Sequence, residues 1–161
     1  MASPKIFIQT NTGFTLIEII TVMGIFALVM AGLSAVTSMD TFRGYDWHGN
    51  RNLIISTLQK ARSQAVNNMC FGAGCTDGLP HGVHLESGKA IVFQGNSYIA
   101  GNSINEIIPI STNIILAGLS DVVFKELTGN VTTVGTINLS DSTLHSSVVD
   151  INSEGRISWT N

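Results

Sequence analysis

Residues 19–39 read IITVMGIFALVMAGLSAVTSM, a run of 21 amino acids that contains no charge. A helix rises about 1.5 Å per residue, so this run is long enough to cross the roughly 30 Å hydrocarbon layer of a bilayer. A buried core helix is the alternative, but a small soluble domain rarely hides so long a helix that is apolar on every side. The stretch predicts one transmembrane helix, which ends at Asp40 and Arg43.

The composition of the whole chain agrees with a membrane segment attached to one modest domain. Of its 161 residues 44% are hydrophobic and only 12% are charged, whereas soluble domains carry about 25% charged residues. The net charge of −3 argues against a general nucleic-acid-binding protein, which needs a basic surface. Two cysteines are too few for a scaffold held together by disulfides.

The residues that precede the run are Gly13-Phe14-Thr15-Leu16-Ile17-Glu18, and Glu18 is the one charge of the apolar block. A carboxylate at membrane depth is costly, which suggests a functional role with a definite partner. A carboxylate at the bilayer edge, near a helix N-terminus, is instead favourable. Physical chemistry alone leaves both interpretations open.

These six residues resemble the prepilin signal of type IV pilins and pseudopilins, in which an uncharged helix of this length follows the motif. The resemblance implies a leader peptide at residues 1–13 and a transmembrane and assembly helix at residues 14–40. It also implies cleavage between Gly13 and Phe14 by a prepilin peptidase, and N-methylation of Phe14. The chain departs from the family pattern at Thr12, where Lys or Arg is usual, and by having no proline near Ala35.

The resemblance assigns a role in assembly to the start of the helix, at Thr15, Leu16, Ile17 and Glu18. Glu18 would face the positive N-terminal amine of a neighbouring subunit in the filament. Opposite charges attract strongly in a low-dielectric helix bundle, and an unpaired charge there is costly. The small residues Ala27, Ala31 and Ala35 either smooth one helix face for close packing or are ordinary apolar residues, and the sequence leaves both open.

Beyond the membrane, residues 41–161 predict a periplasmic or extracellular head. Gly44 and Gly49 weaken a helix, so we expect a kink or short linker within residues 40–50, with Asp46 or Asn50 capping a new helix. Trp47 either lies at the headgroup level or packs under the head. Helical periodicity then returns over residues 51–69, where one apolar stripe should face a sheet: Ile54, Leu58, Ala61, Ala65 and Met69.

The rest of the head predicts strands. A hairpin covers residues 83–93 with a turn at Ser87-Gly88. Further strand candidates are Glu106–Ile110, Asn113–Ala117, Val122–Leu127, Thr133–Ser140, Ser146–Asn152 and Arg156–Trp159, with turns at Thr128-Gly129-Asn130 and Ser153-Glu154-Gly155. The fold class is therefore α+β: a long N-terminal transmembrane helix that continues, with a break, into an amphipathic helix packed on an antiparallel β-sheet head.

Few residues of the head suggest chemistry. Cys70 and Cys75 could form a disulfide that closes a short loop in an exported domain. His81 and His84 lie nearby, but their spacing on a strand points them to opposite faces, so we expect no metal site. No nucleophile or metallohydrolase signature surrounds any histidine, so we expect neither an enzyme nor a cofactor.

The head resembles GspH/FimT-like minor pilins and pseudopilins in the segment LQKARSQA at 58–65, in the strands 82–85 and 90–93, and in the terminal hairpin 149–159. The resemblance implies a structural subunit of a type IV pilus-like or type II secretion-like filament. Its partners would be the prepilin peptidase, other pilins, and an inner-membrane assembly platform with a cytoplasmic ATPase. The subunit would span the cytoplasmic membrane once, with its head outside the cytoplasm. It would then join a filament on the cell surface or in the periplasm.

Two alternatives remain. FimT-like pilins in DNA uptake use a C-terminal Gly-Arg-x-Arg, and Gly155-Arg156-Ile157-Ser158 keeps only Arg156 of its two arginines, so the sequence favours no nucleic-acid partner. A signal-anchored extracytoplasmic enzyme or binding domain is the other alternative. An enzyme would need a nucleophile, a base and an orienting group that converge in the fold.

Overall fold

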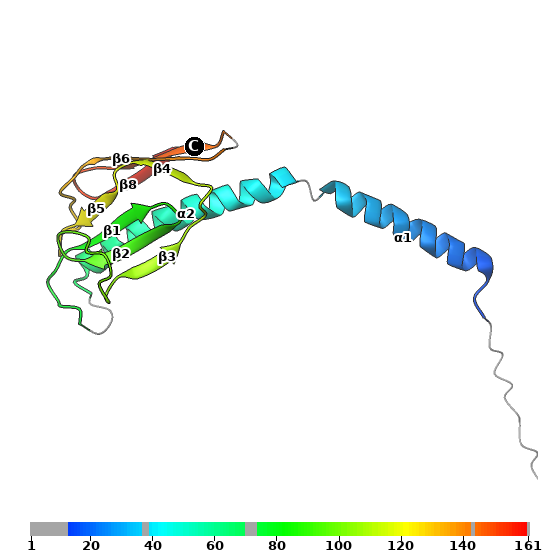
Figure 1. The fold of residues 1–161 in the computed structure, drawn as a ribbon, viewed down its shortest axis with the longest axis horizontal. Coiled ribbons are helices and arrows are strands. Elements are labelled where there is room, and N and C mark those ends of the chain that lie inside the picture. The colour runs from blue at the N-terminus through cyan, green and yellow to red at the C-terminus, as the bar shows by residue number, and fades with distance from the viewer. Residues whose placement is uncertain (1–12, 37–38, 70–73, 143, 161) are drawn as a thin grey trace, which may run out of the picture. The chain divides into compact units, whose positions relative to one another are not determined.

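The computed structural model describes residues 13–36, 39–69, 74–142 and 144–160 (Figure 1). The chain divides into two compact units, Met1–Phe42 and Arg43–Asn161, and we call the second unit the head. Each unit is described by itself.

The first unit contains helix α1, Leu16–Val36. The segment Leu16–Leu33 of this helix is long and apolar enough to cross a membrane. Every side chain from residue 13 to residue 33 is exposed, although the helix is apolar on all sides, so lipid or other helices are needed to cover it. The predicted N-terminal helix is thereby confirmed, and it fits a membrane-anchored protein.

Helix α2, Met39–Val66, is longer than the sequence predicts. The expected kink or linker within residues 40–50 is wrong, because the helix continues through Gly44 and Gly49. Asp46 and Asn50 do not cap a new helix; the Asn50 side-chain amide donates to the Asp46 carbonyl at 2.7 Å and to its Oδ1 at 2.8 Å. Trp47 is only 3% exposed, so the packing alternative for this residue is correct. These contacts offset the cost of two helical glycines, about 1 kcal/mol each.

The C-terminal end of α2 corrects the predicted apolar stripe. Four of its members are 0% exposed: Ile54, Leu58, Ala61 and Ala65. Met69 is 40% exposed and lies beyond the helix. Asn68 takes a left-handed φ of 49°, and the Met69 N–H bonds back to the Gln64 carbonyl at 2.9 Å. This Schellman-type ending turns the chain away before Met69 can join the buried face.

The described residues of the head form two four-stranded antiparallel sheets. The first has the order β3-β2-β1-β5 and the second the order β4-β6-β7-β8. The strands of the first sheet are β1 His81–Glu86, β2 Lys89–Gln94, β3 Glu106–Pro109 and β5 Asp121–Phe124. Those of the second are β4 Ile115–Gly118, β6 Gly135–Ser140, β7 Ser146–Ile151 and β8 Ile157–Thr160. The predicted hairpin and the six further strands are confirmed, with shifted ends.

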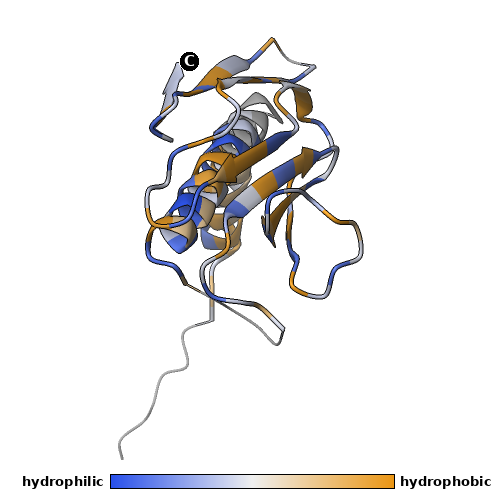
Figure 2. Cartoon of the chain, turned by 90° about the vertical axis from the view of Figure 1, so that its left-hand side faces the viewer, coloured by the Kyte–Doolittle hydropathy of each residue, from blue (hydrophilic) through white to orange (hydrophobic). Residues whose placement is uncertain are grey.

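One core joins α2 to both sheets. Apolar segments, orange in Figure 2, recur along the strands that lie over α2. Strands β6 and β7 alternate buried and exposed residues, whereas residues 90–93 of β2 are four consecutive buried apolar residues. The buried cluster combines the stripe of α2 with residues of the first sheet, such as Val83 and Phe124, and of the second, such as Ile137 and Val149. The α+β fold class is thereby confirmed.

Candidate functional site

The motif at the start of α1 forms a capping box. The Glu18 N–H donates to Thr15 Oγ1, and the Thr15 N–H donates to Glu18 Oε2, both at 3.3 Å. The Thr15 hydroxyl also donates to Glu18 Oε2 at 3.3 Å. Thr15 is the residue before the helix and Glu18 its third residue, so the side chains satisfy backbone N–H groups that the helix cannot. The pattern T-x-x-E is visible in the sequence, but these residues were interpreted as a processing signal and the capping box was not predicted.

The capping box holds the Glu18 carboxylate at the positive end of the helix dipole. A carboxylate accepts about four hydrogen bonds through its two oxygens. The bonds to Thr15 use Oε2, so the carboxylate keeps capacity for a further donor. Both capping residues lie after the Gly13–Phe14 bond, so hydrolysis of that bond leaves the cap in the mature chain.

The other motif residues point outward. Phe14 is 83% exposed, Leu16 77% and Ile17 69%. A Cβ added to Gly13 would meet no atom within 4 Å, so the backbone at the predicted cleavage site is open. Exposed apolar side chains of this size favour any environment that removes them from water.

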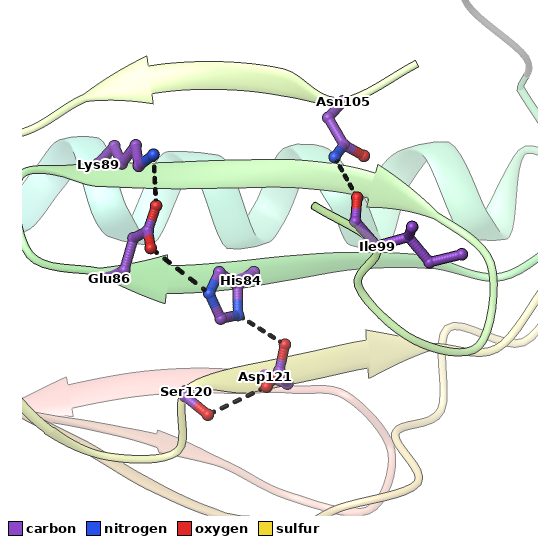
Figure 3. Close-up of polar contacts among 7 residues, drawn as sticks. All are labelled: His84, Glu86, Lys89, Ile99, Asn105, Ser120 and Asp121. Atoms are coloured by element: carbon purple, nitrogen blue, oxygen red, sulfur yellow. Dashed lines mark hydrogen bonds and ion pairs between the residues drawn. The ribbon is translucent and has the colours of Figure 1, made fainter. Parts of the chain in front are cut away.

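A chain of polar side chains crosses the first sheet of the head (Figure 3). His84 on β1 lies opposite Asp121 on β5, and its Nδ1 is 2.8 Å from Asp121 Oδ1. The Ser120 hydroxyl donates to Asp121 Oδ2 at 3.0 Å, while His84 Nε2 lies 4.0 Å from Glu86 Oε2. Glu86 in turn pairs with Lys89 on β2 at 2.5 Å. The sequence did not predict this network of polar side chains, because only the pairing of β1 with β5 brings His84 to Asp121.

This arrangement holds Ser, His and Asp without the order of a hydrolytic triad. The serine hydroxyl bonds the aspartate and not the imidazole, and the second imidazole nitrogen faces another carboxylate. In a triad the histidine would instead accept the proton of the nucleophile. The His84 ring also stacks on Tyr98, with ring centroids 4.0 Å apart. These contacts tie β1, β2 and β5 and the loop of Tyr98 together.

A second His–Asp pair serves the other sheet. His145 Nδ1 lies 2.8 Å from Asp141 Oδ2, and the His145 N–H donates to Asp141 Oδ1 at 3.0 Å. The imidazole stacks on the buried Trp47 ring at a centroid distance of 5.6 Å. The pair therefore fastens the β6–β7 connection to α2.

Of the residues considered for a disulfide or metal, His84 belongs to the first of these clusters, whereas Cys75 and His81 line a separate small pocket. Cys70 lies outside the described residues, so its disulfide with Cys75 stays a prediction. His81 is 6% exposed, and this burial lowers its pKa below the usual 6.5, while a backbone hydrogen bond to Leu79 partly opposes the shift. Within the described ranges, no three His, Cys, Asp or Glu residues are grouped to hold a metal ion.

Arg156, the candidate DNA contact, lies in the turn before β8. Its backbone N–H donates to Asn152 Oδ1 at 2.7 Å, and its side chain lines a cavity together with Arg62 of α2. Ser158, which stands where the second arginine of the family motif would be, is exposed on β8. The structure therefore places Arg156 and Arg62 in the lining of the same cavity, although the two residues are far apart in the sequence.

Comparison with known families identifies the first of these sites. Residues 9–34 match the prokaryotic N-terminal methylation motif, and this range contains Gly13, Phe14 and the capping box. No match to the chain is found among curated proteins or among solved structures. The motif indicates a type IV pilin-like precursor that is processed by a prepilin peptidase and assembles with other pilins. The matched range excludes the head, so its resemblance to GspH/FimT-like proteins stays a prediction.

Proposed function

We propose that this chain is a minor pilin or pseudopilin, a structural subunit of a type IV pilus-like or type II secretion-like filament. One observation carries the proposal: a helix that begins with the methylation motif leaves every side chain from residue 13 to residue 33 exposed. The head, by contrast, encloses its own core. The helix therefore needs partners that the head does not.

The helix would have two successive environments. In the membrane, lipid covers its apolar side chains while the helix satisfies its own backbone hydrogen bonds. In a filament, the helices of neighbouring subunits replace the lipid. Ala27 and Ala31 are exposed on α1 and allow close approach of another helix.

Processing would create the charge that Glu18 needs. Cleavage after Gly13 gives Phe14 a free amine, which keeps a positive charge at neutral pH after one methyl group is added. The amine of one subunit would bind the Glu18 carboxylate of the next, next to the Thr15 cap. Because such a pair has few competing water molecules inside a helix bundle, it would fix the axial register of the subunits.

The remaining parts of the proposal concern location and chemistry. The head would lie outside the cytoplasm, first at the cytoplasmic membrane and then in a filament on the cell surface or in the periplasm. An inner-membrane platform with a cytoplasmic ATPase would drive its assembly. The subunit would have no catalytic activity of its own.

Intact-protein mass spectrometry of membrane and sheared-surface fractions tests the proposal, in cells with and without a prepilin peptidase. With the peptidase, the expected species begins at Phe14 and carries one additional methyl group. The Gly13→Ala variant is the control and should keep residues 1–13. A chain that keeps residues 1–13 beside an active peptidase would favour the alternative of a signal-anchored extracytoplasmic domain.

The same fractions test assembly. A filament subunit should co-purify with other pilins from the sheared or periplasmic fraction, and the fraction that contains it separates a surface pilus from a periplasmic pseudopilus. A processed chain that occurs only as a monomer in the membrane would contradict the filament role.

A further inference from the structure

A cavity of about 390 Å³ lies between the last turns of α2 and the turn that leads into β8. Helix α2 contributes the polar residues Gln59 and Ser63 and the cation Arg62, and the turn contributes Arg156. Val66 and Ile157 add an apolar wall. Among the described residues that line the cavity, the two arginines are the only charged ones.

Arg62 is oriented by backbone rather than by a carboxylate. It lies over two turns whose glycines, Gly129 and Gly155, have left-handed φ values of 68° and 70°. A Cβ on Gly129 would lie 3.3 Å from Arg62 Nε, and a Cβ on Gly155 3.1 Å from the same atom. One terminal nitrogen donates to the Glu154 carbonyl at 3.3 Å. Glycine at both positions leaves room for the Arg62 side chain, and also for Val66 and the Gly129 carbonyl, which lie closer still.

The cavity has positive charge that the head does not neutralise locally. Arg62 Nε is buried without a hydrogen-bond acceptor in the described part of the chain. No salt bridge of Arg62 or Arg156 occurs there either. Two guanidinium groups in one cavity repel each other, and a bound anion relieves this repulsion while accepting their N–H groups.

We propose that this cavity binds a carboxylate flanked by an apolar side chain on a protein partner. The arginines would bind the carboxylate, and Val66 and Ile157 would cover the neighbouring apolar group. A nucleic acid fits less well, because it brings many negative charges to a head whose residues 43–161 contain seven Lys and Arg against nine Asp and Glu. The site belongs to the head, so it does not depend on assembly through α1.

Titration of the ¹⁵N-labelled full chain in detergent micelles tests this site. The probe is the peptide acetyl-Gly-Gly-Leu with a free C-terminal carboxylate, and its C-terminal amide is the matched control. We expect saturable NMR shifts of the Arg62 and Arg156 Nε–H signals with the acid, and affinity about tenfold weaker with the amide. Equal affinity for acid and amide, or no shift with either, would overturn the proposal.

Two variants separate a specific site from general charge. Arg156→Gln removes an exposed side chain and should weaken binding of the acid peptide about tenfold without unfolding the head. Lys125→Gln removes the same charge from an exposed position outside the cavity and should leave the affinity unchanged. Equal losses in both variants would indicate a general charge effect and contradict the site. Tighter binding of inorganic phosphate, or of a single-stranded oligonucleotide, would also contradict it and indicate a phosphate site.

Discussion

Helix α1 and the head contain the same apolar residue types, but these side chains are exposed in α1 and largely buried in the head. Every side chain from residue 13 to residue 33 is exposed, whereas Ile54, Leu58 and Val83 of the head are 0% exposed. In α1 the apolar residues surround the helix, so no intramolecular contact could cover them all. In α2 they recur on one face, which the two sheets cover. The head is thus specified within the chain, while α1 requires lipid or other helices.

Glu18→Ala should produce the largest effect, and it should fall on α1 alone. Under the proposed assembly, the variant leaves the Phe14 amine of a neighbouring subunit without its carboxylate in an apolar bundle. We expect normal cleavage and methylation by mass spectrometry, but at least about a tenfold loss of subunit from the sheared or periplasmic filament fraction. Thermal unfolding of the head should not change.

A matched variant separates the intermolecular charge pair from the helix cap. Thr15→Ala removes the hydroxyl of the capping box but keeps the Glu18 carboxylate. It should cost about 1 kcal/mol of helix stability and reduce assembly far less than Glu18→Ala. Normal filaments from Glu18→Ala, or equal losses from both variants, would refute the proposed pairing.

Gly155→Ala should produce the next largest effect, and this effect should be a loss of stability of the head. The added Cβ would lie 1.9 Å from the Gly129 carbonyl oxygen, at a φ of 70° that favours glycine. We expect a loss of about 3 kcal/mol or more in the free energy of unfolding, measured by urea titration of the full chain in micelles. Processing at Gly13 should be unaffected.

Gly101→Ala is the matched control for this glycine. Gly101 has a similar φ of 75°, but a Cβ there would meet no atom within 4 Å. The substitution should therefore cost only about 1 kcal/mol, from backbone strain alone. If the two variants lost the same stability, close packing against Gly129 would not explain the requirement for glycine at position 155.

The same contrast explains which parts of the fold could be predicted from the sequence. Periodicity located the buried stripe of α2 and the alternation of Ile137 and Leu139, because these patterns depend on local geometry. It failed at Gly44 and Gly49, where burial of Trp47 supports a continuous helix. It also failed at Met69, because the left-handed Asn68 ends the stripe.

The candidate sites divide in the same way. The methylation motif is contiguous, so the sequence alone indicated residues 13–18. His84 and Asp121 are 37 residues apart, and Arg62 and Gly155 approach each other only through the folded head. No local spacing predicts such contacts, because they depend on strand register and on the turn before β8.

A smaller effect, on the pH dependence of stability, should distinguish the buried His81 from the exposed His48. The folded head disfavours protonation of His81, since burial lowers its pKa, whereas the unfolded chain binds the proton near pH 6.5. Stability from this residue is therefore full above pH 6.5 and is lost as the pH falls towards the lower folded pKa. Urea midpoints between pH 7.5 and 5 should fall less in His81→Gln than in the wild type.

His48 provides the control, because it lies exposed on α2. His48→Gln makes the same change at the surface, and its urea midpoint at pH 7.5 should match that of the wild type. An unchanged slope in His81→Gln would show that other groups cause the acid sensitivity of the head.

The smallest effect should come from an ion pair that sharpens the contrast with Glu18. Lys60 on α2 lies 2.5 Å from Glu106 on β3, with the two side chains 42% and 49% exposed. Water and salt screen such a pair, so Lys60→Gln should lower the free energy of unfolding by less than about 1 kcal/mol. The screening length falls to roughly 3 Å in 1 M salt, so the wild type and the variant should then be equally stable. A loss above about 2 kcal/mol that persists in salt would contradict this reasoning. Since Glu18 begins an apolar helix and Lys60 lies on a solvated surface, it is the surroundings of each charge that should make the first essential and the second dispensable.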